Sequence, residues 1–290
     1  MPFVFSTFWS GPLNLREYVC FNSFIRNNHK LEIYTYNSLP DLPKGVCTKD
    51  ASEIISREEY ENYKSKFPKR WDIFSDKFRY LLLYQKGGWW VDADIVCLSS
   101  FIDIRFDQSF MCFQHDGMIN NACLKFTKGD EIMKYCVDYI KKWEKDNNYN
   151  YEKLWWGQFA PPLITEAIKK FNRIDEVFDS KFAFPLPYIQ TLDLLNPSKY
   201  ERLKMLSKDS YFCHLWNEIL SREKIPKSFM GKRGSFWNEL VNLYTGGNYS
   251  SKRIKFKIQS GKDYLSYLLF SIPSLKFLRL KKAIKKKLMN

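Results

Sequence analysis

Apolar and polar residues alternate along the first hundred residues with two different periods, that of a strand and that of a helix. A period of two at residues 3–9 predicts a strand that ends in the turn Ser10-Gly11-Pro12, and apolar residues at helical spacing follow at residues 15–26. The pattern then continues with strands at 31–36 and 46–48, a polar helical stretch at 52–66 and a helix that ends at Gly87. Strands that alternate with helices in this way predict an α/β fold with a mostly parallel central sheet.

The rest of the chain is predicted to continue this domain. Further strands are expected at residues 109–114, 121–126 and 211–216, and further helices at 131–144, 162–170 and 235–244. No clear linker interrupts these elements. We therefore expect one catalytic domain over residues 1–249 and a helical, basic C-terminal appendage over residues 250–290.

The segment 75–94 carries the strongest chemical signal. It reads as a helix, a two-glycine stop, a short apolar strand and then Asp92 and Asp94. Residues i and i+2 of a strand lie on one face, and this pair comes at a strand end, where α/β sheets place ligands. Carboxylate oxygens suit a hard divalent cation, which in turn can hold a diphosphate. The alternative is a solvated loop, since a lone Asp-x-Asp is common by chance.

Asp76 and Arg79 lie one helical turn apart on the helix that precedes this strand. As a surface ion pair they would contribute well under ~1 kcal/mol to stability. Their position just before the Asp-x-Asp strand favours a substrate role instead. In that role Asp76 accepts hydrogen bonds from substrate hydroxyls, and Arg79 faces a hydroxyl or phosphate oxygen.

Two ring side chains outside this segment, Trp9 and His214, are further candidates. Trp9 closes the first predicted strand, where it is either a core residue or a flat ring that stacks on a nucleobase. His214 is one of three histidines and lies in the strand-like segment 211–216. Most histidines have no catalytic role, but a neutral imidazole here can complete a manganese site begun by carboxylates.

The positive charge of the chain is concentrated at its C-terminal end. The formal net charge is +14, and residues 250–290 hold twelve Lys/Arg and one Asp, so this segment carries +11 and the preceding residues only +3. Basic and apolar residues at helix-like spacing favour an amphipathic helix on an anionic membrane surface. A solvated, fraying helix is the plainer interpretation. Nucleic-acid binding ranks lower, because the body lacks an aromatic and basic recognition pattern.

Cysteine usage and hydropathy bear on the compartment. The seven cysteines are odd in number and include no Cys-x-x-Cys, which favours buried thiols in a reducing compartment over disulfides or a zinc site. We find no secretory signal at the N-terminus, and the longest uncharged apolar run near the C-terminus, residues 264–275, is 12 residues long against the roughly 20 that a spanning helix needs. The expected location is cytoplasmic, peripheral at the inner face of the cell membrane.

Several stretches between residues 3 and 220, taken in order, resemble a known family. They are residues 5–11, residues 74–94 (which end in Gly87-Gly88-Trp89-Trp90-Val91-Asp92-Ala93-Asp94), Asn120-Asn121-Ala122, Trp156-Gly157-Gln158 with residues 161–165, and His214-Leu215-Trp216-Asn217. The chain resembles bacterial glycosyltransferases with the DXD sugar-binding motif, around glycosyltransferase family 32 and the capsular polysaccharide synthesis transferases. It is more distantly similar to the glucosyltransferase domain of large clostridial toxins.

The resemblance implies a GT-A fold and sugar transfer from a nucleotide donor with retention at the anomeric carbon. It assigns Trp9 to the donor base, Asp76 and Arg79 to the donor sugar, Asp92 and Asp94 to Mn²⁺ (or Mg²⁺) and the diphosphate, Asn121 to the side of the donor sugar, and His214 to the neighbourhood of the metal. The chain departs from the family at Ala160-Pro161, where the family often has Gly-Pro, so the shape of the acceptor-side loop is open.

Three hypotheses follow for the function. The first is a metal-dependent retaining transferase that moves a hexose or N-acetylhexosamine, from a UDP-sugar, to a surface polysaccharide or lipooligosaccharide. The second is a non-enzymatic membrane- or RNA-binding protein with a degenerate transferase body. The third keeps the enzyme class and makes the acceptor a protein. The donor sugar stays open among galactose, glucose and their N-acetyl forms, with GDP-mannose as a further option.

Overall fold

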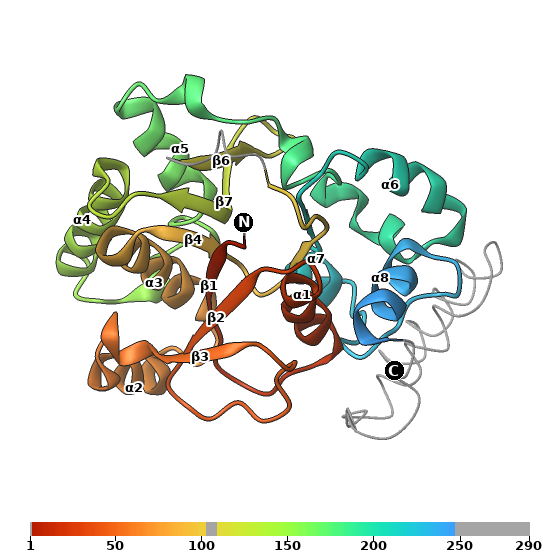
Figure 1. The fold of residues 1–290 in the computed structure, drawn as a ribbon. Coiled ribbons are helices and arrows are strands. Elements are labelled where there is room, and N and C mark those ends of the chain that lie inside the picture. The colour runs from red at the N-terminus through yellow and green to blue at the C-terminus, as the bar shows by residue number, and fades with distance from the viewer. Residues whose placement is uncertain (1, 103–108, 247–290) are drawn as a thin grey trace, which may run out of the picture.

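A six-stranded sheet forms the centre of the molecule (Figure 1). The computed structural model describes residues 2–102 and 109–246. The strand order is β3-β2-β1-β4-β7-β6. Its parallel part consists of β1 (Val4–Phe8), β2 (Lys30–Thr35), β3 (Cys47–Asp50) and β4 (Gly88–Val91). β7 (Ile119–Phe126) runs antiparallel to β4, and β6 (Phe110–Phe113) antiparallel to β7. The predicted α/β class with a mostly parallel sheet is confirmed, and the arrangement is consistent with the expected GT-A fold.

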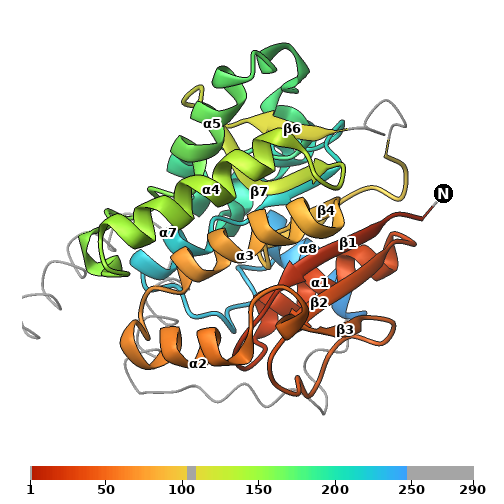
Figure 2. The same cartoon turned by 90° about the vertical axis from the view of Figure 1, so that its left-hand side faces the viewer.

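Helices cover both faces of this sheet, and the sheet separates the apolar core into two layers (Figure 2). One face carries α3 (Trp71–Lys86), α4 (Glu131–Asp146) and α5 (Pro161–Lys170), and the other carries α1 (Leu15–Arg26). Two neighbouring residues of β4 show the division. Trp89 packs in the layer that contains α1, and Trp90 packs in the layer that contains α3. Both indoles are buried, so each face of this central strand is closed by an aromatic ring.

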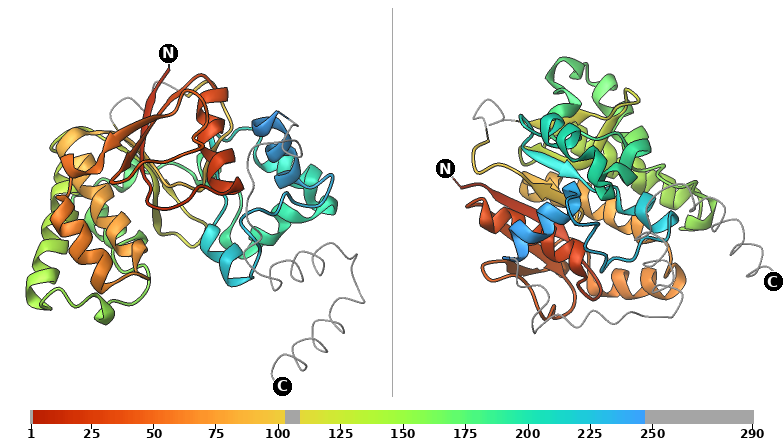
Figure 3. Two further views of the ribbon diagram at one scale, coloured as in Figure 1. Left: turned by 90° about the horizontal axis from the view of Figure 1, so that it is seen from below. Right: turned by 90° about the vertical axis from the view of Figure 1, so that its right-hand side faces the viewer.

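The C-terminal part of the described chain lies beside α1, away from α3 and α4 (Figure 3). It contains the 3₁₀ helix η6 (Tyr188–Leu195), α6 (Tyr200–Leu206), α7 (Asn217–Arg222) and α8 (Phe236–Thr245). A two-stranded sheet connects this part to the Asp-x-Asp region, because β5 (Ile95–Cys97) pairs antiparallel with β8 (Phe212–His214). The register sets Ile95 opposite His214. Since β5 follows Asp94 directly, this pairing brings a distant histidine to the aspartates.

Several elements differ from the predicted ones: α7 was not predicted, β7 begins two residues earlier than expected, and two further regions differ more. The helix expected at 52–66 is a short 3₁₀ turn, η1 (Ala51–Glu53), followed by α2 (Arg57–Lys66). The hydroxyl of Ser56 caps α2 by accepting from the N–H of Glu59 at 3.1 Å, which fixes the start of the helix. Between α5 and β8, a region with no predicted element, the chain forms short 3₁₀ helices and the seven-residue helix α6, and such short elements give no clear period in the sequence.

The expectations about the C-terminal appendage and about membrane-spanning segments depend on which residues the structure describes. The C-terminal appendage at residues 250–290 lies outside the described residues, so the boundary after residue 249 stays a prediction. In the described ranges, every helix is too short or too polar to cross a bilayer.

Candidate active site

The Asp-x-Asp loop begins where β4 leaves the sheet. Gly87 ends α3 at φ 69°, and a Cβ there would lie 2.5 Å from the backbone nitrogen of Lys128, so the junction requires glycine. Beyond β4, the N–H of Asp92 donates to the carbonyl of Ala122 at 2.7 Å and extends the pairing with β7. Because β1 and β4 are parallel, the two carboxylates leave the sheet at the edge where Trp9 follows β1.

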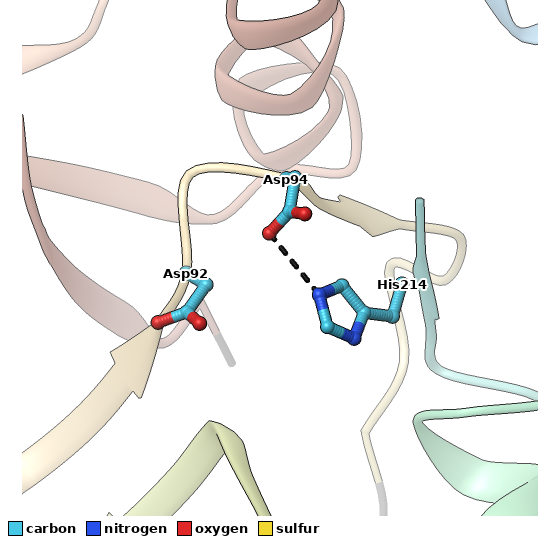
Figure 4. A group of neighbouring side chains, drawn as sticks. All are labelled: Asp92, Asp94 and His214. Atoms are coloured by element: carbon cyan, nitrogen blue, oxygen red, sulfur yellow. Dashed lines mark ion pairs between the residues drawn. The ribbon is translucent and has the colours of Figure 1, made fainter. Parts of the chain in front are cut away.

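Asp92, Asp94 and His214 bring their side chains together at this edge (Figure 4). One oxygen or nitrogen ligand atom from each residue lies within 4.8 Å of the others. His214 Nε2 lies 3.2 Å from Asp94 Oδ1, and the N–H of Asn217 donates to Asp94 Oδ2 at 2.8 Å. The other ring nitrogen of His214, Nδ1, is buried and has no hydrogen-bond partner within the described residues. The three residues predicted as metal ligands are therefore neighbours.

This donor set fits a divalent cation. Two carboxylates and one imidazole combine the oxygen and nitrogen ligands that Mn²⁺ accepts, and the carboxylates alone suit Mg²⁺. Burial alone would raise the pKa of Asp94, but the imidazole of His214 and the N–H of Asn217 lower it below its usual value. Asp94 is thus held as a carboxylate, the protonation state that a metal ligand requires.

Arg79 connects the aspartate cluster to Asp76. Its Nη1 donates to Asp76 Oδ1 at 2.9 Å, and its Nη2 donates to Asp92 Oδ1 at 2.6 Å. The amide of Asn121 donates to the same oxygen of Asp76 at 3.0 Å. The Arg79 and Asp76 side chains are only 3% and 8% exposed, so the surface ion pair considered from the sequence is wrong. Burial raises the pKa of Asp76 to about 7, against the attraction of Arg79.

Two cavities meet at these residues. The first, of about 350 Å³, is lined by Trp9, Trp71 and Lys227 among others, and we call it the Trp9 cavity. The second, of about 600 Å³, contains Trp156 and Arg222 in its wall and is called the Trp156 cavity. They share six lining residues, which are Asp72, Ser75, Asp92, Asp94, Asn217 and Glu218. A site of this shape suits two substrates that meet at the aspartates.

Trp9 combines the two roles considered for it. Its ring is half-buried and packs against the core layer of α1, with Phe21 at a centroid distance of 6.4 Å. The indole also lines the Trp9 cavity, and its N–H donates to the carbonyl of Gly11 at 3.0 Å, which fixes the ring. A ring held in this way at a cavity wall is suited to stack on a planar ligand.

Sequence reasoning missed Lys227. Its ammonium lies 5.2 Å from the centre of the Trp9 ring and forms an ion pair with the buried carboxylate of Glu17 at 2.8 Å. Among the residues that line the Trp9 cavity, Lys227 is the one Lys or Arg against five carboxylates. No local pattern singles it out among 46 Lys and Arg, because contacts between distant segments place it here.

The sequence also matches models of known families over two successive segments. Residues 16–111 match "Glycosyltransferase sugar-binding region containing DXD motif", and residues 125–230 match "Alpha 1,4-glycosyltransferase conserved region". The first segment contains Asp76, Arg79 and the Asp-x-Asp pair, and the second contains His214. The chain is therefore related to glycosyltransferases of the DXD type.

Individual relatives are similar over part of their length. The chain is 23% identical to the lactosylceramide 4-alpha-galactosyltransferase of Mus musculus, over 58% of this chain and 49% of the relative. It is 22% identical to the Homo sapiens enzyme of the same name, over 58% and 50%. The chain thus spans about half the length of these curated relatives. Among solved structures, PaToxG Glycosyltransferase is similar with a TM-score of 0.44 and 13% identity, over 84% of this chain and 85% of that one.

Proposed function

We propose that this protein transfers a hexose from a UDP-sugar to a hydroxyl group of a glycan or glycolipid. The observation that carries the proposal is the meeting of Asp92, Asp94 and His214 at the boundary between two cavities, within segments that match DXD-type glycosyltransferase models. Galactose is the first donor sugar to test, because the relatives named above are alpha-galactosyltransferases.

The donor would lie with its base in the Trp9 cavity and its sugar at the entrance of the Trp156 cavity. The ring of Trp9 supports stacking on the base, and Lys227, in the wall of the same cavity, supplies a positive charge for the diphosphate. Asp92, Asp94 and His214 would hold a divalent cation, which when bound neutralises negative charge on the departing diphosphate. Arg79 and Asn121 fix the carboxylate of Asp76, so that its position for a sugar hydroxyl is set before the donor binds.

Retention of the anomeric configuration is part of this proposal. The carboxylate of Asp76 is held by both Arg79 and Asn121, which makes it a poor nucleophile. We therefore propose that the acceptor hydroxyl attacks on the face from which the diphosphate leaves and gives its proton to the departing diphosphate, without a covalent sugar–enzyme intermediate. A sugar trapped covalently on a carboxylate of the protein, detected by mass spectrometry, would refute this step.

Release of the nucleoside diphosphate (UDP, or GDP from GDP-mannose) from a panel of donors tests the proposed function. UDP-galactose, UDP-glucose, their N-acetyl forms and GDP-mannose are each incubated with the protein and Mn²⁺. We expect release from one UDP-sugar, and a loss on the order of 100-fold in Asp94→Ala because this carboxylate touches the leaving group's counter-ion. Asp138→Ala is the matched control, since Asp138 is exposed on α4 and pairs only with Lys134.

The non-enzymatic alternative gives a different outcome. A binding protein with a degenerate transferase body would release no UDP with any donor, with or without candidate acceptors, and titration calorimetry would detect no Mn²⁺-dependent UDP binding. The bacterial surface-polysaccharide acceptor, the cytoplasmic location and the contact of residues 250–290 with an anionic membrane all stay predictions from the sequence.

A further inference from the structure

Aromatic side chains line the part of the Trp156 cavity that lies beyond the aspartates. Trp155, Trp156, Tyr188 and Trp216 all contribute to the wall of this 600 Å³ cavity. Trp155 is 58% exposed, Trp156 55% and Tyr188 37%. Large apolar side chains that gather at an open cavity mark a binding surface, whereas isolated exposed ones need no explanation. The four residues come from three separate stretches of chain, before α5, at the start of η6 and just before α7, and converge on one space.

Trp216 is held in an unfavourable backbone conformation at this wall. Its φ and ψ are both 53°, a left-handed conformation that a bulky residue rarely adopts. Its indole N–H donates to the carbonyl of Leu186 at 3.0 Å, and its ring centre lies 4.1 Å from that of His214. Strain of this kind persists where the surrounding structure enforces it, often at binding sites. Through this ring contact Trp216 connects the aromatic wall (Trp155, Trp156, Tyr188 and Trp216) to His214, a candidate metal ligand.

Polar acceptors face the same cavity from the β6–β7 turn. The Gln114 amide donates to both carboxylate oxygens of Asp116, at 2.9 and 2.8 Å, and the N–H of Met118 donates to one of them at 3.0 Å. The side-chain amide of Asn120 in turn donates to the side-chain oxygen Oε1 of Gln114 at 2.7 Å. All four residues line the cavity, and Asp116 is exposed. An oriented carboxylate opposite aromatic rings is a combination that binds sugars, which offer hydroxyl donors on their edges and C–H groups on their faces.

The charges of the cavity select against an anionic ligand. Six carboxylates line it, those of Asp72, Asp76, Asp92, Asp94, Asp116 and Glu218. Its two arginines are already paired, Arg79 with Asp76 and Asp92, and Arg222 with Glu218 at 2.8 Å. The guanidinium of Arg222 also lies 4.8 Å from the centre of the Trp156 ring and restrains that ring. A ligand with its own carboxylate would meet net negative charge here.

We propose that this aromatic wall is the acceptor subsite and that it takes a neutral sugar ring. The apolar face of the ring packs on Trp155 and Trp156, and Asp116 accepts from its hydroxyls. The inference rests on the proposed function and makes it more specific, because it selects an uncharged glycan over an acidic one. The subsite opens directly onto Asp94 and His214, so a bound ring lies beside the place proposed for the donor sugar.

Binding of free oligosaccharides to the full chain tests this assignment separately from catalysis. Lactose is the neutral probe and sialyllactose the acidic one, with affinities measured by saturation-transfer NMR. We expect lactose to bind, with an affinity about tenfold lower in Trp156→Ala and Trp155→Ala because a stacked aromatic face is lost. Trp156→Phe should retain most of the affinity. Tyr149→Ala is the matched control, since Tyr149 is 53% exposed on a nearby turn and lines neither cavity.

Two outcomes would overturn the acceptor subsite. One is lactose affinity that is absent in the wild type or unchanged in both tryptophan variants, and the other is sialyllactose binding as tight as lactose. Binding of UDP with Mn²⁺ is measured on the same samples by calorimetry, and the tryptophan variants should leave it unchanged. Absence of UDP binding in a wild type that binds lactose would contradict the donor site instead, so the two failures are distinguishable.

Discussion

Arg79 determines the geometry of the candidate site at the scale of single residues. One guanidinium holds Asp76 with Nη1 and Asp92 with Nη2, so the residue proposed for the donor sugar and a proposed metal ligand have a common support. Lysine cannot reproduce this fork, because its ammonium is a single point of charge. Replacing Arg79 by lysine therefore tests whether the site needs only a positive charge at this position or two directed hydrogen bonds.

Arg79→Lys should lower both stability and metal affinity. We expect the free energy of unfolding to fall by about 1.5–3 kcal/mol, since one charged hydrogen bond in a buried network is lost. Mn²⁺ affinity, followed by electron paramagnetic resonance of the free ion, should fall because Asp92 loses one of its two orienting donors and keeps the indole N–H of Trp90 at 2.7 Å. Arg202→Lys is the control. Arg202 is 44% exposed and binds Asp193 and Gln190 at the surface, so its replacement should change neither measurement. Equal effects of the two substitutions would contradict the argument.

Lys227 should contribute to binding the diphosphate rather than the base. Calorimetry on Lys227→Ala should show UDP affinity about tenfold lower, as expected for one lost charge-assisted hydrogen bond, and uridine affinity unchanged. Lys224→Ala, an exposed lysine that lines neither cavity, serves as the control. A parallel loss of uridine binding would mean that the lysine acts through the Trp9 ring. The substitution also removes the ion pair of the buried Glu17, which in the described structure keeps the backbone N–H of Asn14 as a donor at 3.1 Å. Urea unfolding of the variant checks that this loss has not destabilised the fold.

At the scale of elements, the α3–β4 junction aims the Asp-x-Asp pair. The loop after β7 packs against this junction, since the N–H of Gly129 donates to the carbonyl of Tyr84 in the last turn of α3 and the backbone of Lys128 lies next to Gly87. Both glycines have a positive φ, 69° and 79°, and Gly87 combines it with ψ −166°, a region that is essentially limited to glycine. They differ in the space around them. A Cβ at Gly87 would meet the backbone of Lys128, whereas one at Gly129 would have nothing within 4 Å.

This difference predicts unequal costs for the same substitution. Gly129→Ala should lower the free energy of unfolding by about 1 kcal/mol through backbone strain alone. Gly87→Ala should cost more, about 2–4 kcal/mol, because the strand that carries Asp92 must shift away from Lys128. Urea denaturation of both variants measures the two values. If the two variants were equally stable, the close approach at Gly87 would not be what fixes the start of β4.

At the scale of the whole molecule, local signals in the sequence predicted the elements, and contacts between distant segments made the site. The alternation at β1 and the glycines before β4 are local, so the strand ends and the Asp-x-Asp pair could be located. The 3₁₀ helices between α5 and β8 are only three to eight residues long, too short for a period to be detected, and could not be located. His214 was a candidate by residue type and by resemblance. Its position beside Asp94 comes from the pairing of β5 with β8, which no local pattern encodes.

The basic residues at positions 250–290 lead to a prediction for the whole chain in contact with lipid. Twelve Lys/Arg minus one Asp give this segment +11, most of the net charge of +14. Each basic residue near an anionic surface contributes about 1 kcal/mol, and this attraction is screened by salt. The full chain should therefore sediment with phosphatidylglycerol vesicles at low ionic strength and be released at about 0.5 M salt, where the Debye length is only a few ångströms.

Replacing five of the lysines (Lys281, Lys282, Lys285, Lys286 and Lys287) by glutamine should weaken sedimentation while UDP binding stays unchanged. Equal sedimentation with neutral phosphatidylcholine vesicles would show that the charges are not the cause, and a glycolipid acceptor would then have to reach the aromatic wall without this attraction.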